Sequence, residues 1–208
     1  MADADPAPLS LGEVRRVIHA SPDPRVARTR EAIVKALESL ETGGTALSVS
    51  SLAREAGISR SAFYTHFSGL DELALFILSR AFDEIGAADI ELRRTQTLSG
   101  AQTARRSLTL LTQHLDRHRA LYANVFAAPV SARAHLAAIE LFAAETRAIL
   151  PYTDAAPDAV DAEAVTAFVA AGVMGLLGSW LRGDVVMDAD RLVDHLMMFI
   201  PAWMAADQ

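Results

Sequence analysis

The most restrictive feature of this sequence is the spacing of its apolar residues, which follows the period of an α-helix almost without interruption from Arg25 onward. In the first such stretch, Ile33 and Leu37 lie four residues apart, and the pair Gly43-Gly44 supplies a stop. No segment alternates apolar and polar residues as a half-buried strand would. We therefore expect an all-α fold.

The same spacing predicts the remaining helices and their boundaries. They are two short helices from Ser48 and from Ser59, a long one from Asp71 to about Arg94, and others over 101–116, 118–127, 131–149, 158–181 and 188 to about 204. Residues 1–24 hold four prolines and no sustained period, so they are expected to form a flexible tail. We predict a helix-turn-helix domain over 25–72 and a second helical domain over 73–208.

Composition excludes several classes of protein. The 208 residues include no cysteine, which rules out disulfides, thiol nucleophiles and thiolate zinc sites. The first eight residues lack the basic and apolar regions of a signal peptide. The longest apolar stretch, 167–181, contains three glycines and is too short to span a bilayer. A cytoplasmic protein with no membrane partner is the expectation.

Charge is distributed unevenly along the chain. The net charge of −7 divides into −2 over residues 1–24, +1 over 25–80 and −6 over 81–208. An acidic protein does not bind nucleic acid as a bulk polycation, so any DNA contact requires a local surface. The segment 25–80 is the one region without an acidic excess.

That segment contains SVSSLAREAGISRSAFYTHFSGL over residues 48–70, which has the features of a helix-turn-helix. Ser48 and Ser59 suit the N-caps of two short helices. Gly57 suits the left-handed conformation of a sharp turn between them, and Ile58 is expected to fill the interior of that turn. Phe63 and Phe67, four residues apart, would hold the second helix to the core. Its other face presents Arg60, Ser61, Tyr64 and Thr65, a polar surface able to enter the major groove.

The complete string resembles the N-terminal domain of TetR-family transcriptional repressors. The matching elements are Leu52-Ala53, Ala56-Gly57, Ile58-Ser59, Phe63-Tyr64-Thr65-His66-Phe67 and Asp71-Glu72-Leu73. The resemblance covers about residues 29–75. It implies a homodimer that binds a palindromic operator in double-stranded DNA and responds to a small-molecule effector, most often as a repressor.

The resemblance also implies roles for single residues. Arg60, Ser61 and Thr65 would face base edges, with Arg60 the best candidate for bidentate pairing with guanine. Phosphate contacts are implied for Tyr64 and His66, and for Ser48, Ser50 and Ser51 at the start of the neighbouring helix. Ser59 also belongs to the predicted DNA-binding residues, with capping as its first role. Family members usually carry a lysine just before the acidic-Leu helix start, where this chain has Leu70. Arginines near the first helix (Arg25, Arg28, Arg30) or on the tail (Arg15, Arg16) could replace the lost phosphate contact.

The second domain is expected to pair two subunits. Small residues at helical spacing allow close helix approach, and the last helix is apolar over a broad front. The predicted dimer interface consists of Gly172, Gly175, Ser179, Leu196, Phe199 and Trp203. Each of these residues also suits the core of a monomer.

The family implies an effector pocket among the middle helices of this domain. The candidate lining residues are Leu110, His114, Tyr122, Phe126, Phe142, Phe168 and Met174. Such a set suits a small, mostly apolar compound, although each member also suits an ordinary core. The sequence does not identify the effector.

The sequence also allows three alternatives. His114 and His118 lie four apart and could share a metal, but no third ligand stands between them, so we predict no metal and no cofactor. Gly172, Gly175 and Gly178 lie within a helix and do not form a phosphate loop, and no catalytic motif supports an enzyme. The other reading is an all-α small-molecule binding protein with a degenerate DNA-reading surface, to which Leu70 lends some support.

Overall fold

Helices make up the regular structure of this protein. The computed structural model describes residues 24–42, 47–127, 132–153, 157–158 and 160–205. Within these ranges the elements are α2 (Pro24–Thr42), α3 (Val49–Glu55), α4 (Arg60–His66), α5 (Leu70–Thr95), α6 (Gly100–Arg117), α7 (Arg119–Ala127), α8 (Ala132–Ile149), α9 (Ala162–Arg182) and α10 (Ala189–Phe199), with 3₁₀ turns η2 (Leu150–Tyr152) and η3 (Ala202–Ala205). The described ranges contain no strand, and the all-α prediction is confirmed. The predicted tail lies outside them, apart from its last residue.

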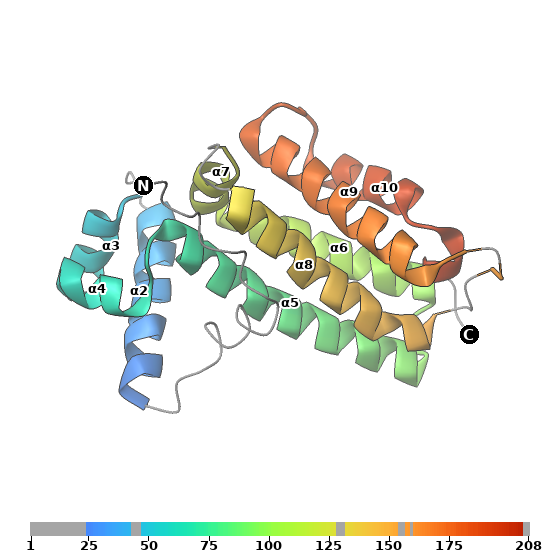
Figure 1. Cartoon of the computed structure of the whole chain (residues 1–208), viewed down its shortest axis with the longest axis horizontal. Helices are drawn as coiled ribbons and strands as arrows, with labels where there is room; N and C mark the ends of the chain where they lie inside the picture. The colour runs from blue at the N-terminus through green and yellow to red at the C-terminus, as the bar shows by residue number, and fades with distance from the viewer. Residues whose placement is uncertain (1–23, 43–46, 128–131, 154–156, 159, 206–208) are drawn as a thin grey trace, which may run out of the picture.

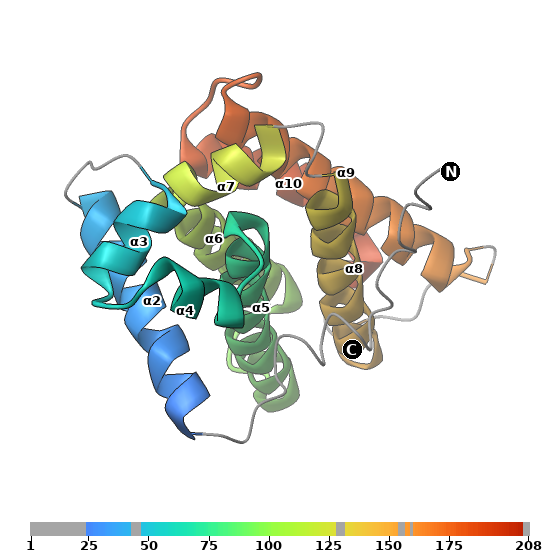
Figure 2. The same ribbon diagram turned by 60° about the vertical axis from the view of Figure 1, so that its left-hand side comes forward.

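The helices form a small head and a larger body joined by α5 (Figure 1). In the head, α2, α3 and α4 pack on one another. α5 begins beside α4 and runs along the body, where it packs on both α6 and α8. α9 packs on α7 and α8, and α10 packs on α6 (Figure 2). One continuous helix therefore connects the head to the interior of the body.

A single apolar core extends through both parts. In the head it includes Ile33, Leu37 and Phe63, each fully buried, and it continues through Leu73 and Leu78 of α5 into the body. Phe67 and Phe76 meet at 5.4 Å between ring centroids, which ties the end of α4 to α5. The Arg30 guanidinium lies over both rings, at 5.5 and 5.3 Å from their centroids. The head is therefore fixed firmly to the start of α5.

Two helix boundaries differ from those expected. The helix expected from Asp158 begins at Ala162, because the Asp161 carboxylate accepts hydrogen bonds from the backbone N–H groups of Glu163 and Ala164. The last helix was expected to reach Met204 but ends at Phe199. Pro201 has no N–H group, and Ile200 before it is extended, with φ −78° and ψ 129°. Trp203 and Met204 consequently belong to a separate turn.

Gly57 adopts a φ of +67° at the turn between α3 and α4, as expected. Replacement by alanine places a Cβ in the left-handed region and should lower the free energy of unfolding by about 1–2 kcal/mol. No atom lies within 4 Å of the position of this added Cβ, so the cost is one of backbone conformation alone. Gly57→Asn is the matched control, since asparagine tolerates this conformation better. Equal losses for the two variants in urea denaturation would contradict this account.

Candidate DNA-binding surface and effector cavity

The turn between α3 and α4 is built from local hydrogen bonds. Ser48 caps α3 in a reciprocal pair with Ser51, each side chain accepting from the other's backbone N–H. Ile58 donates its backbone N–H to Ala53 O at 2.9 Å, which closes the turn. Ser59 then caps α4 by accepting from Ala62 N at 3.0 Å. These contacts fix the angle at which α4 leaves α3.

The two faces of α4 differ sharply in burial. Phe63 is fully buried and Phe67 is 1% exposed. Arg60, Ser61, Tyr64 and Thr65 are all exposed on the other face. Within the described residues Arg60 makes no hydrogen bond or ion pair, while the Thr65 hydroxyl donates to Ser61 O at 3.0 Å. α4 therefore exposes a guanidinium and several hydroxyls to solvent on one face, while its opposite face is anchored in the core.

The serines flanking this surface differ in accessibility. Ser50 is exposed, whereas Ser51 is 6% exposed and its hydroxyl donates to Ser48 O at 3.0 Å. The Ser51 side chain is thus occupied by the helix cap. Ser48 and Ser59 combine exposure with their capping roles.

His66 lies half-buried at the end of α4. Burial, followed by the positive charge of Arg30, lowers the pKa of His66 below its usual value of 6.5. The imidazole is therefore neutral near pH 7 and can donate one ring N–H. The neutral imidazole can therefore donate a hydrogen bond to a phosphate, but it adds no positive charge to the surface.

The basic residues considered as substitutes for the missing lysine are placed differently from one another. Leu70 is half-buried and packs against the core. Arg30 stacks on Phe67 and Phe76, so its role is structural, and Arg28 donates to Pro24 O at 3.2 Å on an exposed turn of α2. Arg15 and Arg16 lie outside the described residues.

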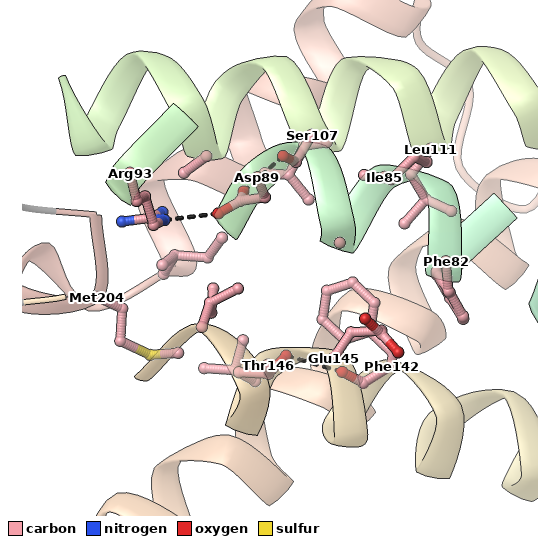
Figure 3. Close-up of a pocket in the computed structure, with 16 residues that line it drawn as sticks. Phe82, Ile85, Asp89, Arg93, Ser107, Leu111, Phe142, Glu145, Thr146 and Met204 are labelled. Atoms are coloured by element: carbon pink, nitrogen blue, oxygen red, sulfur yellow. Dashed lines mark hydrogen bonds and ion pairs between the residues drawn. The ribbon is translucent and has the colours of Figure 1, made fainter. Parts of the chain in front are cut away.

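A cavity of about 90 Å³ lies in the body between α5, α6, α8 and α9, with Met204 at one end (Figure 3). Its walls are largely apolar, with Phe82, Leu108, Leu111 and Phe142 among them. The polar groups are Asp89 and Arg93 of α5, Ser107 of α6, and Glu145 and Thr146 of α8. An apolar chamber with a few convergent polar groups is typical of a small-molecule site.

The cavity includes one of the residues predicted to line it. Phe142 does so, whereas Tyr122 and Met174 are buried elsewhere and Leu110 is half-buried outside the lining. Phe168 is 74% exposed and does not line this cavity. It faces outward because Val169 and Ala170, its neighbours on α9, take the buried side. The Phe126 side chain lies outside the described residues.

The polar residues of the cavity were missed at the sequence level. Phe82, Ile85, Gly86, Asp89 and Arg93 lie along one stripe of α5. A charged pair continuing the apolar stripe of a long helix was the available signal. That signal is weak, because an i, i+4 acid–base pair is ordinarily a feature of exposed helix surfaces.

His114 joins a buried polar cluster rather than the cavity. Its Nε2 lies 2.9 Å from the Tyr122 hydroxyl, and its ring contacts that of His118 at 4.9 Å between centroids. His118 Nδ1 in turn lies 2.7 Å from Glu41 Oε2 of α2, a direct polar contact between body and head. Among the described residues, no group of three or more histidine, aspartate or glutamate side chains could hold a metal ion.

The outer faces of α9 and α10 are unusually apolar. Phe168 of α9 is 74% exposed, and Met198 and Phe199 of α10 are 70% and 63% exposed. Of the predicted interface residues, Gly172 is exposed, while Gly175, Ser179 and Trp203 are half-buried. Leu196 is 1% exposed and belongs to the core of its own subunit. By length and hydropathy α9 could cross a membrane, but half of its most apolar window is buried inside the protein, as in a core helix.

The fold and the exposed face of α4 together define a helix-turn-helix DNA-binding protein. Residues 32–76 match the family model of bacterial regulatory proteins of the tetR family. The N-terminal part of the chain therefore carries the DNA-binding domain of TetR-family transcriptional regulators, a family of regulators rather than enzymes. The resemblance inferred from the sequence is thus confirmed.

Solved structures share the fold at low sequence identity. The dihydroxyacetone kinase operon activator DhaS aligns with a TM-score of 0.57 and 18% identity, over 86% of this chain and 98% of its own. RolR in complex with resorcinol aligns with a TM-score of 0.53 and 15% identity, over 85% of this chain and 89% of its own. FadR of Thermus thermophilus in complex with lauroyl-CoA aligns with a TM-score of 0.55 and 18% identity, over 82% of this chain and 92% of its own. Comparison with curated protein sequences gives no match.

The buried histidine cluster predicts an acid-sensitive fold. Burial, then the charges of His118 and Arg117, lower the pKa of His114 from 6.5 to about 3. Below pH 6.5 the unfolded chain takes up a proton that the folded protein does not, so stability falls as the pH falls toward 3. His114 should account for a loss of about 2 kcal/mol between pH 6.5 and pH 5.

The measurement is urea unfolding at a series of pH values, with His114→Gln as the comparison. Glutamine can still bond to the Tyr122 hydroxyl but does not titrate. The variant should therefore show a smaller loss of stability over this interval. Parallel pH profiles for the two proteins would exclude His114 as the source of the acid sensitivity.

Proposed function

We propose that this protein is a homodimeric repressor that binds a palindromic operator through α4 and releases it when a small compound occupies the cavity of the body. The observation that carries the proposal is the exposed polar face of α4, opposite a face locked by Phe63 and Phe67. On this surface Arg60 reads bases, as do Ser61 and Thr65. Tyr64, His66 and the exposed serines contact phosphates, and the protein acts in the cytoplasm.

The exposed apolar faces of α9 and α10 support a dimer. Monomeric soluble proteins rarely expose groups of large apolar side chains, and Phe168, Met198 and Phe199 are all more than half exposed. The adjacent Gly172 has open space around the position of a Cβ, so a partner helix can approach closely there. Two subunits paired through these helices would place two copies of α4 on half-sites about one DNA turn apart, roughly 34–36 Å.

The cavity supports regulation by a small molecule. It lies against α5, the helix that begins four residues after α4 ends. A compound that binds better to one orientation of α5 shifts the population of dimers with the correct spacing of α4. The neighbouring structures of RolR and FadR each contain an organic compound, which supports a ligand-responsive function for this fold.

Arg60 should determine selectivity for the operator. An operator is first recovered by selection from random DNA, and binding is then followed by fluorescence anisotropy. Arg60→Ala should weaken selective binding about 10- to 100-fold, corresponding to the roughly 1–3 kcal/mol of one bidentate base contact. Arg60→Lys keeps the charge but not the planar fork, so it should retain non-specific affinity and lose discrimination.

The control for charge is Arg94→Ala, which removes the same charge from an exposed side chain at the opposite end of α5. Its operator affinity should match that of the unmodified protein. Unchanged selectivity in both Arg60 variants would instead favour a small-molecule binding protein with a degenerate DNA-reading surface.

Phe168→Glu should convert the dimer to a monomer, because it places a charge at the centre of the proposed interface. The measurement is molar mass by light scattering after size-exclusion chromatography. Leu136→Glu is the matched control, since Leu136 is 58% exposed but lies on α8. Dissociation by the control alone would move the interface to α8, and loss of operator binding should accompany dissociation by Phe168→Glu.

A further inference from the structure

The cavity contains a buried arginine whose hydrogen-bonding capacity is only partly used. The Arg93 side chain is 2% exposed, and its Nε donates to Asp89 Oδ1 at 2.6 Å. The other Asp89 oxygen accepts from the Ser107 hydroxyl, also at 2.6 Å. Within the described residues, neither terminal nitrogen of Arg93 has a hydrogen-bond partner, although both are buried.

This arrangement is unfavourable unless something else supplies acceptors. Buried donors on a charged group cost more than neutral ones when they are left unpaired, and no atom of the described residues accepts a hydrogen bond from these two nitrogens. Asp89 meanwhile holds the Nε edge, so the guanidinium is oriented before any ligand arrives. Its terminal edge carries two nitrogens side by side, the geometry that matches the two oxygens of a carboxylate; because both are buried, a ligand reaches them only with a local shift of the cavity wall.

The remaining walls define the rest of the ligand. Figure 3 shows Arg93 at the end of the cavity with Met204, while Phe82, Phe142 and Glu145 lie toward the other end. The Glu145 carboxylate lies over Gly86, where any Cβ would collide with it. Its negative charge disfavours an anionic group at that end, and the apolar side chains there suit a hydrocarbon body. The volume of about 90 Å³ limits that body to a few carbon atoms or one ring.

We propose that the effector is a small organic carboxylate, its carboxylate bound end-on by Arg93 and its apolar body lying between Phe82 and Phe142. Only the release of operator DNA by the carboxylate rests on the proposed function, because binding of the carboxylate to the cavity can be measured without DNA. It makes Asp89 and Ser107 positioning residues, which act by orienting the guanidinium.

The test uses the full chain and isothermal titration calorimetry. Benzoate and hexanoate are the probes, with benzamide and hexanamide as neutral isosteres and benzylamine as the cation. At least one acid should bind, and its amide should bind at least about tenfold more weakly, because a neutral amide forms weaker hydrogen bonds to a guanidinium. Binding of the amide or the amine as tightly as the acid would overturn the proposal, as would the absence of binding by both acids at millimolar concentration.

Two variants assign the effect to Arg93. Arg93→Lys keeps the charge and loses the fork, so acid affinity should fall by at least about tenfold. Asp89→Asn with Arg93→Met removes the ion pair while keeping similar volumes, a change that buried ion pairs often tolerate. Retained operator binding shows that the double variant is folded, and acid affinity unchanged from that of the unmodified protein would overturn the proposal.

Adding the acid to the protein–operator complex separates this inference from the proposed function. Release of operator by the acid in the unmodified protein, but not in the double variant, supports both. Arg93-dependent acid binding with no change in operator affinity supports the ligand class and contradicts the proposed switch. Operator release by the amide alone contradicts the ligand class and leaves the switch standing.

Discussion

The rigid continuity of α5 is the constraint on which the rest of the structure depends. This helix of 26 residues carries Phe76 near one end, where it packs on Phe67 of the recognition helix, and Asp89 and Arg93 near the other. Since an α-helix rises about 1.5 Å per residue, the buried ion pair lies roughly 20 Å along the axis from Phe76. A helix held by packing along its length moves as a unit, so a displacement at the cavity reaches α4 directly.

The helix-turn-helix could be predicted from sequence because its conformation is determined locally. Ser48 and Ser59 cap their helices through contacts within three residues, and Gly57 takes the one backbone conformation that disfavours other residues. The apolar period places Phe63 and Phe67 on one face whatever they pack against. The end of α10 is equally local, because Pro201 stops the helix even though the apolar spacing continues beyond it.

The cavity could not be predicted in the same way, because its walls come from four helices whose relative rotations follow from packing. Phe168 and Phe142 are both aromatic residues on apolar helices, yet one is 74% exposed and the other lines the cavity. Periodicity alone does not show which stripe of a broadly apolar helix faces its own subunit. The burial of the Asp89–Arg93 pair could not be predicted either. Its i, i+4 spacing is common on exposed helix surfaces, and its burial depends on packing against α6 and α8.

The head and body are also joined away from α5, and this second contact limits how the head can move. Glu41 of α2 meets His118 at the junction of α6 and α7, and both side chains are buried. Phe76 and His118 therefore hold the head at two separate points, one apolar and one polar. Sliding of α5 against a fixed contact at His118 would rotate the head rather than translate it. In the proposed switch, the polar contact would therefore serve as a pivot for movement of α5, and rotation of the two heads would change the separation of the two α4 helices in the dimer.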